Sequence, residues 1–207
     1  PAPEEELPRA PLSPSALGVD PAHAGGAATP GGSDAARRGT VLHLLFELLP
    51  GLAGDERAEA GRRMIARAMP DLAEADRAGL LAEALRVLAA FPELFGDAAR
   101  AEVPVIGSVA GREISGQIDR LVIAPDSVTL VDFKSNRVPP AGPDQVPPAY
   151  VAQLALYRAL LAPLFPGRAL RCRLIWTVDA SATDLSPERL EAALAATGFG
   201  AYAMGAA

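Results

Sequence analysis

Two kinds of hydrophobic spacing divide the sequence into a helical first half and a mixed second half. Up to about residue 90, apolar side chains recur at the three- and four-residue intervals of a helix face, as in Leu42, Leu45, Phe46 and Leu49. This pattern predicts three helices, over residues 35–49, 55–69 and 71–90. Pro50 and Pro70 follow the first two, at positions where helices commonly stop.

From about residue 101, apolar and polar positions alternate, as they do in strands. The alternation predicts strands over residues 101–110, 112–124, 127–135 and 169–178. Two further helices are expected over residues 149–165 and 186–203, the second with Ser186 as its N-cap and Pro187 in its first position. This order of elements predicts an α/β or mixed α+β fold, in which helices flank a central sheet.

Residues 1–35 show neither spacing and are rich in Pro, Ala and Gly, so we expect a flexible linker there. Residues 36–207 are enough for one domain with a sizeable core. We expect a helical section over 36–100 and an α/β core that carries the chemistry over 101–207. The sequence starts at Pro1, and we expect it to be a piece of a longer protein.

Charge and cysteine content narrow the function classes. The formal net charge of -6 argues against sequence-blind attraction to nucleic acid through net charge, although a local basic groove would still allow binding. The single cysteine, Cys172, excludes an internal disulfide and a cysteine-rich zinc or iron–sulfur site, and it is interpreted as a buried strand thiol in a reducing compartment, the cytoplasm. No signal peptide is apparent, and no apolar run is long enough to span a membrane.

The segment TLVDFKSN, residues 129–136, places opposite charges in a strand otherwise suited to burial. Because strand side chains alternate, Asp132 and Lys134 face one side, and Val131 and Phe133 face the other. Charges that are buried need partners. The alternative is a salt bridge between Asp132 and Lys134 on the surface of a hairpin.

The preceding strand carries a second acid, Asp119. A hairpin turn centred between Pro125 and Asp126 would set Asp119 opposite Asp132. Two adjacent carboxylates repel each other, and one lysine does not neutralise both. A hard divalent cation such as Mg²⁺ would, since it binds protein carboxylates together with water and phosphate oxygens.

Other polar residues on helices become candidates beside this acid pair. On its own, a histidine between leucines, as His43 is, is more often a packed core residue than a ligand; near two acids it can bind a metal as a neutral imidazole. Gln153 and Tyr157 share a helix face by their four-residue spacing. That face is either the polar side of an amphipathic helix with a half-buried tyrosine, or a ridge that positions a nucleic-acid strand or Lys134. Arg120 and Arg137 are candidates for phosphate contacts.

Taken in order, these segments resemble the RecB-like branch of the PD-(D/E)xK nuclease superfamily. Four segments match the motifs of that branch: RRGTVLHLLFELL with His43, SGQIDRLVI with Gly116, Asp119 and Arg120, VTLVDFKSN with Asp132, Phe133 and Lys134, and YVAQLALYRALL with Gln153 and Tyr157. A D-x-K segment alone is weakly specific, whereas four motifs in this order are strongly specific.

The resemblance implies a restriction-endonuclease-like core that hydrolyses DNA with Mg²⁺, or with Mn²⁺. His43, Asp119, Asp132 and the Phe133 carbonyl would hold the metal. Lys134 would orient or deprotonate the attacking water. Gln153 and Tyr157 would support Lys134 or the DNA strand.

Within that branch, VDFKSNR, the proline-rich loop after it and the Y-x-x-Q-L-x-x-Y helix are most similar to the C-terminal nuclease domains of AddA-type helicase–nuclease subunits. This similarity implies processing of double-strand breaks, DNA strands supplied by a helicase motor in the same full-length chain, and an AddB-like partner. No phosphate-binding helicase motif is present, so ATP would act only through that motor, and one cysteine leaves no iron–sulfur cluster. Two alternatives stay open: an idle DNA-binding or assembly module, and a stand-alone exonuclease.

Overall fold

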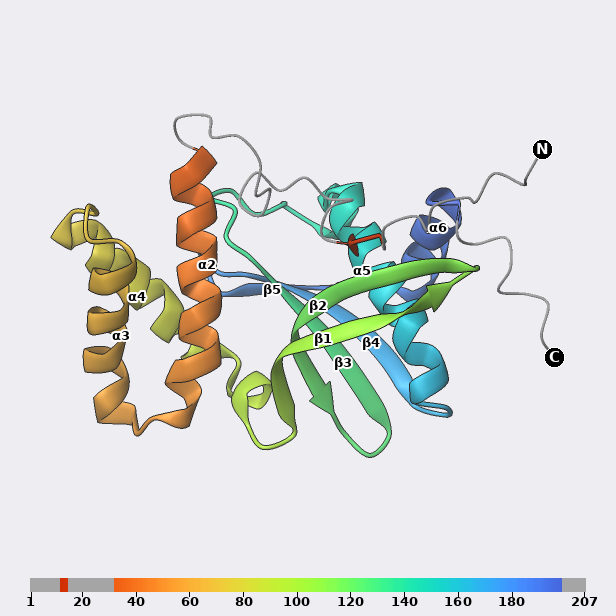
Figure 1. Ribbon diagram of the computed structural model, residues 1–207, viewed down its shortest axis with the longest axis horizontal. Coiled ribbons are helices and arrows are strands. Elements are labelled where there is room, and N and C mark those ends of the chain that lie inside the picture. Colours follow the sequence, from red (N-terminus) through yellow and green to blue (C-terminus); the bar gives the residue numbers. More distant parts are fainter. Residues whose placement is uncertain (1–11, 15–31, 199–207) are drawn as a thin grey trace, which may run out of the picture.

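The fold is described from a computed structural model, which places residues 12–14 and 32–198. The predicted linker over residues 1–35 therefore lies mostly outside the described residues, and a helix already begins within its last part, at Gly32. We call the segment that contains the first three long helices the helical section (Figure 1). It comprises α2 (Gly32–Leu48), η1 (Leu49–Gly51), α3 (Gly54–Ala68) and α4 (Glu74–Ala90), and η2 (Pro92–Phe95) follows it.

In the described part of the chain, five strands form one sheet in the order β1-β2-β3-β4-β5. The strands are β1 (Ala99–Val109), β2 (Arg112–Ile123), β3 (Ser127–Lys134), β4 (Ala169–Trp176) and β5 (Ser181–Leu185). Of these five strands, only β3 and β4 pair in parallel. Parallel neighbours need a crossover, and the connection between β3 and β4 therefore carries η3 (Pro143–Gln145), α5 (Pro148–Leu161) and η4 (Ala162–Leu164). Helix α6 (Pro187–Ala196) follows β5.

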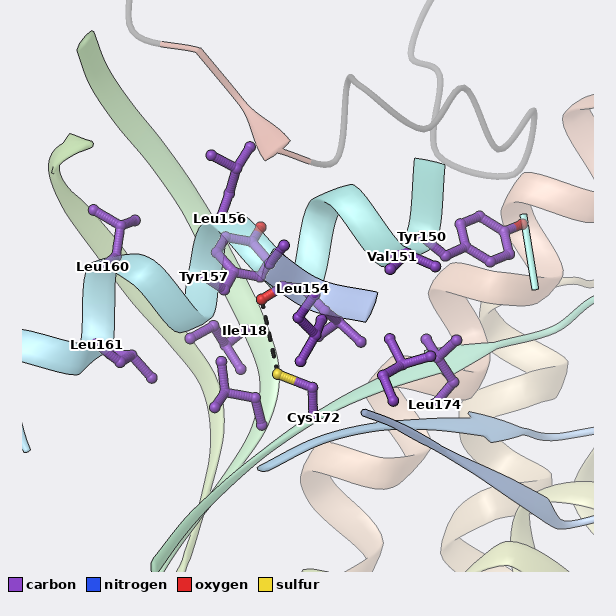
Figure 2. Packing of buried hydrophobic residues seen from close by; sticks show 14 of the residues in the cluster. Ile118, Tyr150, Val151, Leu154, Leu156, Tyr157, Leu160, Leu161, Cys172 and Leu174 are labelled. Carbon is purple, nitrogen blue, oxygen red and sulfur yellow. Dashed lines mark hydrogen bonds between the residues drawn. The ribbon is translucent and has the colours of Figure 1, made fainter. Parts of the chain in front are cut away.

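Strand β3 is buried on both faces. Val128 and Leu130 belong to a core between the sheet and helices α5 and α6, whereas Val131 and Phe133 belong to a second core against the helical section. Figure 1 shows the helical section and α5 on different sides of the sheet, and Figure 2 shows the packing under α5. The predicted alternation along TLVDFKSN is therefore correct, and Asp132 and Lys134 lie on the α5 side.

The predicted hairpin has the expected register. Arg120 pairs with Val131 and Ile123 with Val128, so the turn centres between Pro125 and Asp126. Extended by one step beyond the paired residues, this register would set Asp119 opposite Asp132. There the Asp119 carboxylate accepts a hydrogen bond from the backbone N–H of Phe133, with 2.7 Å between Oδ2 and N.

The predicted fold class, a mixed α+β fold with a central sheet and flanking helices, is confirmed, but some elements differ. Strand β5 was not predicted, because Ser181–Leu185 is short and mostly polar or small, and its strand form depends on pairing with β4. Helix α4 begins at Glu74 rather than at residue 71, after a turn. Ser186 caps α6 as predicted, accepting a hydrogen bond from Arg189 N, and the part of that prediction beyond residue 198 lies outside the described residues. None of the described helices has the length and apolar character needed to cross a membrane.

Candidate metal centre

Three side chains from three elements converge beside the sheet. His43 lies on α2, Glu102 on β1 and Asp119 on β2. The Nδ1 atom of His43 is 3.6 Å from Glu102 Oε1 and 3.6 Å from Asp119 Oδ1. One ligand atom from each residue lies within 4.8 Å of those of the other two, so the three can face a single ion.

The donor types fit a hard divalent cation, and the three ligand atoms are near enough to one another to share one. In an octahedral site with metal–oxygen distances of ~2.1 Å, neighbouring ligand atoms are ~3 Å apart and opposite ones ~4.2 Å. The two 3.6 Å separations are ~0.6 Å wider than the neighbouring-ligand distance, so the acids would close in slightly on a bound ion. Two carboxylates suit Mg²⁺ or Mn²⁺, and the imidazole adds a ligand that Mn²⁺ accepts readily.

Glu102 is a candidate ligand that the sequence analysis did not identify. Its backbone φ of 49° is in the left-handed region although it lies within a strand, a strained conformation that functional sites often contain. Gln117 Nε2 donates to Glu102 Oε2 at 2.8 Å and so orients the carboxylate. The available signal was a single acid in the apolar stretch AEVPV, which is the same kind of anomaly as Asp132 in β3.

The electrostatics of the cluster favour a bound cation. Burial, together with the charge of Asp132, raises the pKa of Asp119 to about 7, against the opposing effect of His43. Burial alone would lower the pKa of His43, but Asp119, Glu102 and Asp132 outweigh it and raise that pKa to about 9. The acids therefore stabilise positive charge at this position. A divalent ion bound to the imidazole, in place of its proton, would supply such positive charge.

A second group adjoins the cluster on the α5 side. Lys134 Nζ is 2.8 Å from Asp132 Oδ2 and donates to Gln153 Oε1 at 3.2 Å, while Gln153 Nε2 donates to Asp132 Oδ1 at 2.9 Å. The Lys134 ammonium also lies 4.1 Å from the ring centroid of Tyr150. Burial would lower the pKa of Lys134, but Asp132 outweighs it and raises that pKa.

Asp132 lies outside the three-residue cluster, within the described residues, but it remains a candidate ligand. Its Oδ2 atom is 2.8 Å from Lys134 Nζ, and its Oδ1 atom accepts a hydrogen bond from Gln153 Nε2. Each carboxylate oxygen has two lone pairs, so Oδ2 could bind a cation as well as the Lys134 ammonium. The roles predicted for Asp132 and for the Phe133 carbonyl in holding a metal stay predictions.

The helix residues divide into two roles. Gln153 contacts both Asp132 and Lys134, in agreement with the predicted support of the lysine. Tyr157 is buried, and its hydroxyl accepts from Gln117 N at 3.3 Å, at the side of β2. It therefore packs against the strand that carries Asp119 and is not a half-buried surface tyrosine.

The two arginines predicted to contact phosphate differ. Arg120 is only 5% exposed; its guanidinium donates to the Phe46 carbonyl and lies 4.8 Å from the ring centroid of Phe95. The Arg120 side chain therefore packs in the core of the helical section, and its predicted contact with phosphate stays a prediction. Arg137 is exposed in the loop after β3 and remains a candidate.

The match to a family profile agrees with the motif pattern. Residues 18–196 match the sequence profile of the PD-(D/E)XK nuclease superfamily. A search of curated proteins gave no match. Among solved structures, a proposed exonuclease from Eubacterium rectale is similar at 14% identity with a TM-score of 0.44; the aligned region covers 73% of this chain and 63% of that one. The structure of SSO0001 is similar at 15% identity with a TM-score of 0.36, covering 72% and 74% of the two chains.

Proposed function

We propose, from the premise that this chain belongs to the PD-(D/E)XK nuclease superfamily, that it is a metal-dependent deoxyribonuclease that hydrolyses phosphodiester bonds. The observation that carries the proposal is the convergence of His43, Glu102 and Asp119 beside a buried pair of Asp132 and Lys134. One lysine and one histidine do not balance three carboxylates, of which Asp132 is buried and Glu102 and Asp119 are partly buried, so a divalent cation would neutralise the remaining negative charge.

Each residue has a defined part in this proposal. His43, Glu102 and Asp119 would hold Mg²⁺ or Mn²⁺, with Asp132 Oδ2 and the Phe133 carbonyl as further ligands. A bound divalent cation supplies positive charge to the phosphate and lowers the pKa of a coordinated water. Lys134 is held as an ammonium by Asp132, Gln153 and the Tyr150 ring, so we assign it to orienting the attacking water and to stabilising negative charge on the phosphate.

The proposed biological setting follows from the sequence motifs. We propose that the domain works as the nuclease part of an AddA-like helicase–nuclease that processes double-strand breaks for recombinational repair in the cytoplasm. A motor in the same full-length chain would supply unwound strands, and an AddB-like subunit would be the partner. The net charge of -6 supports this setting, because an acidic domain gains from a motor that delivers DNA to it.

A cleavage assay tests the enzymatic proposal. End-labelled single-stranded and double-stranded DNA would be incubated with the protein and Mg²⁺, Mn²⁺ or EDTA. We expect cleavage with either metal and none with EDTA. Asp119→Asn should lower the rate by ~10²–10³-fold because it weakens the metal site.

Asp126→Asn is the matched control, since it makes the same change in an exposed acid at the turn of the same hairpin. It should cleave like the wild type. Metal-dependent binding of DNA without cleavage would instead favour the idle DNA-binding module. Equal specific activity of this chain and the full-length protein would favour a stand-alone exonuclease.

A further inference from the structure

Glu83 is a buried carboxylate far along the sequence from every residue assigned above. It lies on α4 and is 4% exposed, on the helix face that also buries Leu80, Ala84 and Val87. A carboxylate in such a place costs stability unless it is paired and hydrogen-bonded. Among the residues that the structure describes, Glu83 has two partners, one on α2 and one directly after β4.

The first partner is Arg38 on α2, whose guanidinium Nη2 donates to Glu83 Oε2. The second is Thr177, directly after β4, whose hydroxyl donates to Glu83 Oε1 at 2.6 Å. Arg38 precedes His43 by five residues on the same helix. The Glu83 carboxylate thus joins the helix that carries one metal-ligand candidate to the end of β4.

Thr177 in turn holds the strand that carries the catalytic candidates. Its backbone N–H donates to the carbonyl of Lys134 at 3.0 Å, one step beyond the pairing of Lys134 with Trp176. Thr177 is 1% exposed, so this contact is shielded from water. The Lys134 side chain is fixed by Asp132 and Gln153, and its backbone is fixed through Thr177.

We infer that Glu83 is a positioning residue of the proposed nuclease centre: through Arg38 and Thr177 it sets the His43 helix relative to the strand end that bears Lys134. The inference rests on the proposed function. A well-packed apolar residue would stabilise the fold as well as a buried ion pair does, so geometry is the property that the carboxylate adds. Misplacing a catalytic group by ~1 Å can cost ~10²-fold in rate.

The test compares Glu83→Gln, Thr177→Val and Thr177→Ser with Glu74→Gln. Glu74 is an exposed acid on the same helix, so its change is chemically matched. We expect Glu83→Gln and Thr177→Val to lower kcat on single-stranded DNA by ~10- to 100-fold, with KM changed less than threefold. Thr177→Ser keeps the hydroxyl and should restore most of the rate, and Glu74→Gln should match the wild type.

A second measurement, NMR of the Lys134 side chain, distinguishes a positioning role of Glu83 from a loss of stability, and it does not depend on nuclease activity. Lys134 is the only lysine in the sequence. Tag-free protein labelled with ¹³C-lysine therefore gives one Cε signal, which should shift in Glu83→Gln and Thr177→Val at temperatures where both are fully folded. An unmoved signal, or a kcat per folded molecule equal to that of the wild type, would overturn the inference. If the wild type does not cleave DNA, the proposed function fails, and the lysine signal alone decides whether Glu83 positions Lys134.

Discussion

At the scale of single residues, Gly116 and Tyr157, which both belong to the motif pattern, pack directly against each other. Gly116 lies against Tyr157 so closely that a Cβ added at residue 116 would be 2.5 Å from the Tyr157 hydroxyl oxygen and 2.9 Å from its Cε1. That hydroxyl accepts from the neighbouring Gln117 N. The glycine and the tyrosine therefore form one packing unit, which fixes α5 against the strand that bears Asp119.

We predict that Gly116→Ala lowers the free energy of unfolding by ~1–3 kcal/mol, because backbone or ring must shift to admit the methyl group. Tyr157→Phe removes the hydroxyl, so it should relieve part of that cost in the double variant. Urea unfolding measures all three. Gly79→Ala, at a helix position with no atom near the new methyl group, is the control and should be neutral or stabilising. Wild-type stability of Gly116→Ala would contradict the packing account.

Arg120 and Arg137, the two arginines considered for phosphate contacts, give a second prediction at the scale of residues. Arg120→Met should lower the free energy of unfolding by ~2 kcal/mol or more, since it removes a charged donor from the Phe46 carbonyl and its contact with Phe95. Arg137→Met should leave the free energy of unfolding unchanged and weaken DNA binding. The slope of the logarithm of the binding constant against the logarithm of salt concentration should fall by about 1, as expected for the loss of one phosphate contact. Denaturation and fluorescence anisotropy at several salt concentrations test both. Loss of DNA affinity without loss of stability in Arg120→Met would contradict the burial assignment.

At the scale of elements, β3 and β4 form a parallel pair whose α5 side is closed by helix packing. Cys172 on β4 lies beneath α5, with its thiol directed at the Leu154 carbonyl, 3.8 Å from Sγ to O (Figure 2). Its neighbours in this core include Ile118, Leu154 and Leu174. The single cysteine is thus a probe of whether α5 and the sheet stay together.

Burial raises the pKa of Cys172 to about 12, so at pH 8 the thiol of the folded protein is protonated and inaccessible. We predict that Ellman's reagent reacts with the native protein far more slowly than with protein in urea, where the pKa returns to ~8.5. The native rate should follow the unfolding equilibrium as urea is added. Fast modification of the native protein would show that α5 does not cover β4 as described.

At the scale of the whole molecule, the candidate centre lies where two hydrophobic cores meet. His43 comes from the helical section, whereas Lys134 and Gln153 face the core under α5. The acids of β1 and β2 complete the cluster. Neither part of the molecule contains the whole set, so the proposed chemistry depends on how the helical section docks on the sheet.

The sequence was sufficient for the features that depend on local spacing. Alternation predicted that Asp132 and Lys134 share one side of β3, and the predicted turn has the observed hairpin register, in which Asp119 reaches the backbone N–H of Phe133. Features that depend on distant contacts were not predictable: Glu102 has a left-handed backbone, and Arg120 is buried by contacts with Phe46 and Phe95. Spacing shows which residues share a face, but it does not show what covers that face.

The cation site itself is the central claim, and anomalous diffraction from crystals soaked in Mn²⁺ tests it most directly. We predict one strong anomalous peak within ~2.3 Å of His43 Nδ1 and of an oxygen from both Glu102 and Asp119. The peak should disappear in Asp119→Asn and persist in Asp126→Asn. A fully soaked crystal with no peak between these three side chains, or with its strongest peak elsewhere on the molecule, would contradict the account.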